Sequence, residues 1–126
     1  MGRVFDETRV NGHNWWTIFD SGASNSYITA AAARSLKPKP IPNPFIARVG
    51  GRSQKIEDVC EVMGSVRGKS VVVQAFVIPR LGQDRASGRQ IEFLFGALAM
   101  QQWGIELNLK KEKLDLRHYS RDFLEF

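Results

Sequence analysis

Short stretches of alternating apolar and polar residues, separated by turn residues, run along most of this chain. Residues 14–19 are rich in aromatic and β-branched side chains, and residues 71–78 are rich in valine and other β-formers. Many short strands of this kind with frequent turns are typical of a small all-β barrel or sandwich. The pattern predicts strands over residues 3–10, 14–19, 45–49, 56–62, 71–78, 91–95, 105–109 and 114–117.

Turn residues indicate how these strands are joined. Asn11-Gly12 is a strong hairpin signal because both residue types tolerate positive φ. Gly50-Gly51 predicts a second turn, and residues 64–70 predict a third. Four prolines between residues 37 and 44 exclude a helix or an interior strand, so we expect a stiff extended connector there.

Helix is predicted in two places only. The alanines at residues 30–33 favour a short helical turn, and residues 97–103 favour one or two turns closed by Gly104. The segment 79–90 is polar and contains glycine, which predicts a loop. The fold class that follows is all-β, with one clear short helix near the C-terminus.

The composition fits a single compact domain over residues 1–126. Hydrophobic residues make up 43% and charged residues 25% of the chain, which is close to the soluble average. No apolar run approaches the roughly 20 residues that a membrane helix needs. The first ten residues carry four charges and no apolar core, so we expect no signal peptide. With Cys60 as the single cysteine, a soluble and cytoplasmic protein is favoured, although the location stays open.

A net charge of +5 raises the question of a nucleic-acid partner. The basic residues are scattered without a dense block, and near the C-terminus they alternate with acidic residues, which indicates a solvated surface. A basic β-barrel that binds nucleic acid would need aromatic residues interleaved with Lys and Arg on one sheet face. The aromatic residues here lead into Asp20 instead, so no nucleic-acid partner is expected.

The segment Ile18-Phe19-Asp20-Ser21-Gly22 carries the most informative chemistry. An apolar strand delivers a carboxylate into a turn, and Gly22 lets the backbone approach a neighbour closely. The tripeptide Asp-Ser-Gly is common in surface turns, so it is weak by itself. The surrounding order of motifs makes it specific.

The chain resembles the retropepsin-like family of aspartic proteases over residues 3 to 117. That family has a hairpin leading to hydrophobic-hydrophobic-Asp-(Thr/Ser)-Gly-Ala, a glycine-rich flap hairpin, then a hydrophobic pair with Gly before a short helix. The resemblance implies a small closed acid-protease barrel with Asp20 as the catalytic carboxylate. The matching positions are Ser21, Gly22, Ala23 and Ser24 in the active-site loop, Val49, Gly50, Gly51 and Arg52 at the flap tip, and Leu94, Phe95 and Gly96 in the psi-loop.

The resemblance also implies further roles. The flap covers residues 45–62, and pocket residues would include Ile28, Val49, Ile78 and Leu81. The chain departs from the family pattern at Ser21, where Thr is commoner, and after Gly96, where many relatives carry Arg, Met or Asp and this chain has Ala97. The second departure puts in doubt a polar contact at the helix start.

Catalysis of this type needs two carboxylates that share a proton, and the sequence has one Asp-Ser-Gly. The second carboxylate must therefore come from another copy of Asp20 across a two-fold axis, so we expect a homodimer. By resemblance, Ser21 would bond across that axis. The expected substrate is a polypeptide bound in extended form between the subunits. No cofactor and no metal are expected.

Two further expectations concern activity. Ala23 cannot donate a hydrogen bond to the aspartate as the hydroxyl residue of pepsin-like relatives does, so activity should extend toward neutral pH.

The alternative function is a retropepsin-like domain that has lost catalysis and serves as a dimerisation or peptide-binding module. The intact motif argues against it.

The remaining candidate residues favour structural roles. His13 and His118 lack partners at metal-ligand spacing, and Cys60 is predicted to be a small buried apolar residue. Ser24 and Ser26 have no nearby His and Asp in sequence, so a serine nucleophile is not expected. A C-terminal tail over residues 118–126 carries Phe123, Leu124 and Phe126, which suggest packing on a partner or continuation into a longer protein.

Overall fold

A computed structural model describes residues 2–120 of the chain. It opens with a hairpin of β1 (Arg3–Val10) and β2 (His13–Asp20), in the antiparallel register that the intervening turn dictates. Asn11 and Gly12 form this turn with φ of 50° and 82°, as the sequence predicts for a two-residue hairpin loop. The hairpin therefore fixes the point at which Asp20 leaves the sheet.

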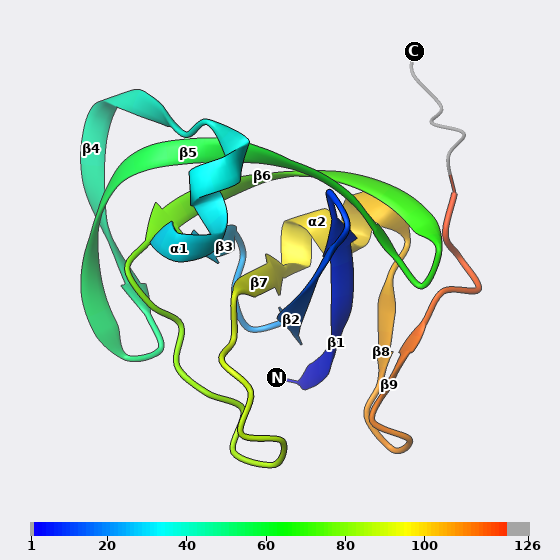
Figure 1. The fold of residues 1–126 in the computed structure, drawn as a ribbon. Coiled ribbons are helices and arrows are strands. Elements are labelled where there is room, and N and C mark those ends of the chain that lie inside the picture. The colour runs from blue at the N-terminus through cyan, green and yellow to red at the C-terminus, as the bar shows by residue number, and fades with distance from the viewer. Residues whose placement is uncertain (1, 121–126) are drawn as a thin grey trace.

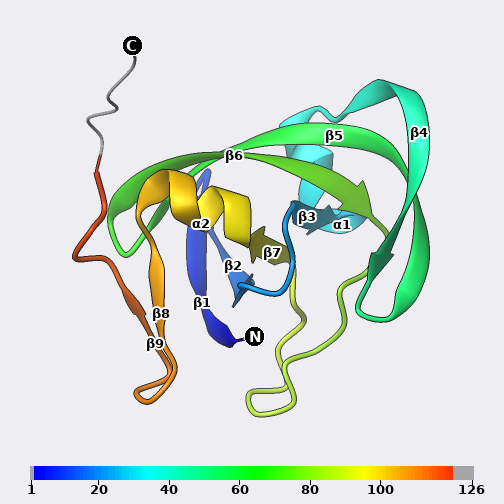
Figure 2. The same ribbon diagram turned by 180° about the vertical axis from the view of Figure 1, so that it is seen from behind.

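Seven strands form the main sheet in the order β1-β2-β7-β3-β6-β5-β4, and β1 also pairs with β5 through Thr8 and Arg9. Figures 1 and 2 show β5 and β6 arching over the smaller central strands. The elements beyond the first hairpin are β3 (Ser26–Thr29), α1 (Ala30–Ala33), the 3-10 turn η1 (Arg34–Leu36), β4 (Lys39–Val49), β5 (Arg52–Val66), β6 (Lys69–Ile78), β7 (Phe93–Gly96), α2 (Ala97–Trp103), β8 (Glu106–Asn108) and β9 (Lys113–Asp115).

The proline-rich segment is part of a strand, which corrects the expectation of a connector. β4 lies at the edge of the sheet and pairs with β5, with an irregularity between Pro40 and Phe45. Proline lacks an N–H donor, and an edge strand has one side that needs no donor. The prolines therefore exclude an interior strand but leave an edge strand open.

The turn predicted over residues 64–70 is also shorter than expected. β5 continues to Val66, and Arg67-Gly68 makes the turn with φ of 50° and 79°. Gly64 lies within the strand, where a side chain would meet the Arg9 carbonyl oxygen at 2.5 Å. This glycine therefore allows β1 to cross close to β5 and is not a turn residue.

The predicted helices and the C-terminal hairpin are present. α2 ends at Gly104, whose φ of 68° fits a glycine cap, and β8 pairs with β9. α1 is a four-residue helix that the Thr29 hydroxyl caps by accepting from the Ala32 N–H. The chain is thus mostly β with two short helices.

Two apolar clusters lie on opposite faces of the first hairpin. The main core contains Phe19, Phe93 and Phe95, none of which is exposed to solvent. A second cluster packs on the other face of β2 and centres on the side chains of Ile18, Tyr27, Ile56, Ile78, Ile91 and Leu94. Asp20 lies two residues after Ile18, so its side chain leaves β2 on the same face as the second cluster.

No helix among residues 2–120 is long and apolar enough to cross a membrane. The closed barrel and the two-fold dimer expected from the sequence stay predictions at this point. The predicted tail residues Phe123, Leu124 and Phe126 lie outside the described residues.

Candidate active site

Asp20 is the last residue of β2, and its side chain is half-buried beside the second apolar cluster. Its Oδ1 accepts a hydrogen bond of 2.8 Å from the Gly22 N–H. No other donor within the described residues reaches this carboxylate. One oxygen is therefore oriented by the turn and the other is available to a water or to a second carboxyl group.

The Ser21 side chain meets the N-terminal segment of its own chain. Its hydroxyl accepts from the Gly2 N–H at 3.0 Å and lies 3.1 Å from the Gly2 carbonyl oxygen, while the Ser21 N–H donates to that carbonyl at 3.0 Å. These contacts extend the β1–β2 pairing past Asp20. They hold the start of the active-site loop at the end of the hairpin.

The rest of the loop is joined to β7 and α2. Asp20 lies opposite Gly96 in the parallel β2–β7 pairing, and the Gly96 N–H donates to the Ser26 hydroxyl at 3.0 Å. A side chain at Gly96 would overlap the Asn25 carbonyl oxygen and lie 2.9 Å from that of Ala23. Gly96, the last of the predicted psi-loop residues, thus contacts the loop that follows Asp20.

The start of α2 also binds this loop. The Ala97 N–H donates to the Ala23 carbonyl at 2.7 Å, and the Leu98 N–H donates to the Ser24 carbonyl at 3.1 Å. Helix N-termini leave such N–H groups without intrahelical partners. The carbonyl groups of Ala23 and Ser24 accept from these two N–H groups. The start of α2 is therefore bound to the loop even though Ala97 has no polar side chain.

The predicted flap tip is the turn between β4 and β5. Gly50 and Gly51 have φ of 58° and 79°, and no atom lies within 4 Å of a side chain built at either position. Val49 packs against the second apolar cluster, whereas Arg52 opposite it is exposed. The four residues form an open turn beside the face that bears Asp20.

The predicted pocket residues divide into two groups. Val49 and Leu81 are half-buried against the second apolar cluster, and Ile78 is one of its buried members. Ile28 is wrong as a pocket residue, because it is fully buried in the main core. β3 places alternate side chains on opposite faces, so Tyr27 faces the second cluster in its place.

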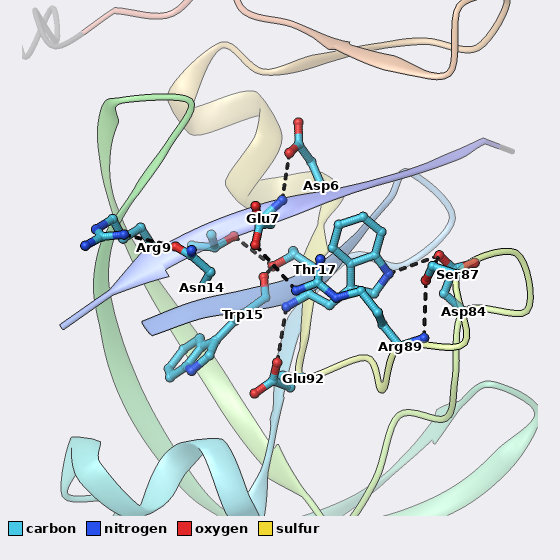
Figure 3. A network of polar contacts seen from close by, with 12 residues as sticks. Asp6, Glu7, Arg9, Asn14, Trp15, Thr17, Asp84, Ser87, Arg89 and Glu92 are labelled. Atoms are coloured by element: carbon cyan, nitrogen blue, oxygen red, sulfur yellow. Dashed lines mark hydrogen bonds and ion pairs between the residues drawn. The ribbon is translucent and has the colours of Figure 1, made fainter. Parts of the chain in front are cut away.

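A polar network that the sequence reading missed anchors the loop between β6 and β7 (Figure 3). Asp84 is 7% exposed and accepts from Ser87 Oγ at 2.7 Å, Trp16 Nε1 at 3.0 Å and the Ala86 N–H at 3.1 Å. The Arg89 guanidinium lies 4.2 Å from the centroid of the Trp16 ring. The sequence around Asp84 does not predict that this aspartate is buried, because its partner Trp16 lies 68 residues away in the chain.

These hydrogen bonds affect the ionisation of Asp84. The Ser87 hydroxyl, followed by the Trp16 and Ala86 donors, lowers the pKa of the carboxyl below its usual value against the opposing effect of burial. The carboxylate is therefore ionised and holds the loop against β2. Trp16 lies four residues before Asp20, so the loop and the active-site strand form one unit.

Arg3 is the titratable residue directly opposite Asp20 in the β1–β2 register, whereas His118 and Cys60 belong to other parts of the described structure. His118 contacts Glu106 at 3.5 Å on the surface, and burial raises the pKa of the Cys60 thiol to about 11. Within residues 2–120 no group of three His, Cys, Asp or Glu residues could hold a metal ion. Cys60 is buried, as the sequence predicts.

A surface hollow of about 630 Å³ lies beside the active-site loop. It begins at Ser21 and runs along α2 to β8 and the residues after it. The lining is largely apolar, and Leu109 at its rim is 53% exposed. The lining residues are Ser21, Ala97, Met100, Gln101, Gly104, Ile105, Glu106, Leu107 and Leu109.

Comparison with known proteins assigns the family. The aspartyl protease family model matches residues 7–97. The retroviral protease-like domain of Ddi1 from Leishmania major has 18% identity and a TM-score of 0.63, over 93% of this chain and 90% of that one. The simian foamy virus (mac) protease has 14% identity and a TM-score of 0.50, over 79% of this chain and 92% of that one. No curated protein sequence matches the chain. The chain has a retropepsin-like fold and belongs to the aspartyl protease family.

Proposed function

We propose that this protein is an aspartic endopeptidase that works as a homodimer, with one Asp20 from each subunit. The observation that carries the proposal is the position of Asp20 at the end of β2. The Gly22 N–H orients one oxygen of its carboxylate, and the loop that follows is held by β7 and α2.

The reaction requires a second carboxyl group, and the described part of the chain supplies none beside Asp20. Asp6 is paired with Arg67, Asp115 with Arg117, and Asp84 is bound to Trp16 and Ser87. A two-fold axis beside the loop would bring a second Asp20 into place. The hollow beside Ser21 and the exposed Leu109 supply apolar surface for such contact.

The proposed dyad would hydrolyse a peptide bond by general acid–base catalysis. Two carboxyl groups at close range share one proton, so one is a base and the other an acid. The ionised group takes a proton from the attacking water, and the protonated group donates to the scissile carbonyl oxygen. The tetrahedral intermediate then collapses with protonation of the amine that leaves.

The flap would close over an extended peptide. The Gly50-Gly51 turn is uncrowded, and Val49 packs an apolar side chain against the second apolar cluster. Closure excludes water from the dyad and orders the substrate backbone as an added strand. The apolar cluster under the flap would form the walls of the side-chain pockets.

The test is cleavage of a mixed peptide library from about pH 4 to 7.5, with Asp20→Asn as the inactive variant. Asp58→Asn on β5 is the matched control, because it makes the same chemical change away from the loop. We expect cleavage by the parent and by the control, none by Asp20→Asn, and activity that persists near neutral pH because Ala23 donates no hydrogen bond.

The result that would overturn the proposal is equally specific. If folded, dimeric parent protein and Asp20→Asn give the same absence of cleavage, the alternative of a silent dimerisation or peptide-binding module is favoured. Sedimentation of both proteins in the same buffer establishes whether a dimer was present. The same assay extended to lower pH tests the role given to Ala23, and activity found only below about pH 3 would contradict that role.

A further inference from the structure

We propose that the cleft selects peptides with Asp or Glu side chains near the scissile bond, through Arg3, Arg52 and Arg80. The inference rests on the proposed function, since it names the substrate class of the same site. It goes beyond that function because it assigns charge recognition to three arginines that the catalytic chemistry does not use.

Arg3 lies beside the catalytic carboxylate. In the β1–β2 register Arg3 is directly opposite Asp20, so both side chains leave the same face of the hairpin. The next pair on that face is Phe5 with Ile18, and both pack in the second apolar cluster. Arg3 is exposed and thus presents a cation on the face that bears Asp20.

Arg52 lies on the inner face of the flap. It is directly opposite Val49, whose side chain packs against the second apolar cluster, so the two residues share a face. The neighbouring pair, Arg48 with Ser53, faces the other way because strand residues alternate. One arginine of the flap tip therefore faces the cleft and the other faces away from it.

Arg80 lies at the start of the loop between β6 and β7. It is exposed and precedes Leu81, which packs against the same apolar cluster as Val49. The Asp84 network fixes this loop against β2, as Figure 3 shows. Arg80 is thus an exposed cation next to Leu81, on a loop that is anchored to β2.

Two acidic side chains on this face already have partners, and a third, Asp20, lies opposite Arg3. On the same face Glu7 is paired with Arg89, and Glu92 Oε1 accepts from the Trp16 N–H. From residue 21 to 55 the sequence holds six basic residues and no Asp or Glu. Within residues 2–120, Arg3, Arg52 and Arg80 have no ion-pair or hydrogen-bond partner in their side chains. The positive charges of Arg52 and Arg80 are therefore available to a ligand, and Arg3 adds a positive charge beside Asp20.

A peptide carboxylate is the ligand that fits this arrangement. Guanidinium and carboxylate groups form charge-assisted hydrogen bonds, and these strengthen when closure of a flap removes water. The apolar cluster between the arginines suits apolar side chains at the scissile bond itself. The preferred sequence thus has an apolar centre with Asp or Glu on either side.

Binding to the Asp20→Asn protein tests this selectivity without cleavage. Two fluorescent peptides share an apolar centre and differ only by Glu or Gln at the flanking positions, and anisotropy gives each Kd. We expect the Glu peptide to bind about tenfold more tightly, and Arg52→Gln or Arg80→Gln to reduce that ratio about threefold each. Arg48→Gln is the matched control, because it removes the same charge from the outer face of the same hairpin.

Equal binding of the two peptides, or an equal loss of the ratio in Arg48→Gln, would overturn the proposal. So would tighter binding of a single-stranded oligonucleotide that depends on Arg52, because the arginines would then serve nucleic acid. The Glu/Gln ratio of kcat/KM in the parent enzyme is the second measurement. Cleavage of both peptides at equal kcat/KM refutes the selectivity alone, whereas charge-selective binding without any cleavage refutes the proposed catalysis alone.

Discussion

Gly96 is a residue at which space, and not backbone conformation, excludes a side chain. Its backbone is extended, but a methyl group there would overlap the Asn25 carbonyl oxygen. We expect Gly96→Ala to lower the free energy of unfolding by about 3 kcal/mol, because the active-site loop must shift to make room. Urea denaturation measures the change.

The matched control for this variant is Gly12→Ala. A side chain at Gly12 meets no atom within 4 Å, but its φ of 82° is strained for alanine. Its expected cost is about 1 kcal/mol, from backbone conformation alone. A loss in Gly96→Ala no larger than in Gly12→Ala would contradict the close approach of β7 to the loop.

Cys60 permits a second prediction about a single residue. It is 4% exposed, and desolvation raises the pKa of its thiol to about 11. The thiolate is the reactive form, so alkylation by iodoacetamide at pH 8 should be about 100-fold slower in the folded protein than in urea. Mass spectrometry follows the reaction, and equal rates in the two states would show that the residue is accessible.

The loop between β6 and β7 depends on the ionised Asp84 carboxyl. Because hydrogen bonds lower the pKa of Asp84 in the folded state, its contribution to stability is full above the unfolded pKa of about 3.9. That contribution is lost as the pH falls through the folded value. We expect Asp84→Asn to unfold at lower urea at neutral pH and to lose less stability than the parent on acidification.

Variants on the same loop sharpen this test. Ser87→Ala removes the donor with the largest effect on the Asp84 pKa, so it should give an intermediate pH slope. Asp58→Asn makes the same chemical change on β5, away from this loop, and is the matched control for the loss of one carboxyl group. An unchanged slope in Asp84→Asn would show that the carboxyl does not anchor the loop.

Across the whole molecule, the features that the sequence predicts are those set by residues close together in the chain. Asp20, the flap turn and α2 follow from local signals: a strand that ends at a carboxylate, a glycine pair and a helix closed by Gly104. The two-residue turn at Asn11-Gly12 also sets the hairpin register that places Arg3 opposite Asp20. Local features of this kind depend on residues close together in the chain.

Features that depend on distant partners were missed. The role of Asp84 requires Trp16, 68 residues away, and the strand assignment of the β4 prolines requires pairing with β5. The burial of Ile28 depends on which face of β3 meets the core. The sequence likewise does not predict that Arg3 and Arg52 lie on the side of the second apolar cluster. That placement depends on the β1–β2 and β4–β5 registers.

The proposed dimer makes a prediction that no single chain can show. If each active site needs Asp20 from two subunits, mixing parent with an equal amount of Asp20→Asn and allowing exchange leaves about one quarter of the dimers with both carboxylates. Total activity should therefore fall to about half of its value before mixing, because half of the parent subunits become trapped in mixed dimers. Asp58→Asn in place of Asp20→Asn should cause no such loss, since its own Asp20 is intact. Activity that stays at the level of the parent after subunit exchange, verified by sedimentation, would mean that one Asp20 is sufficient and that the second carboxyl group lies elsewhere.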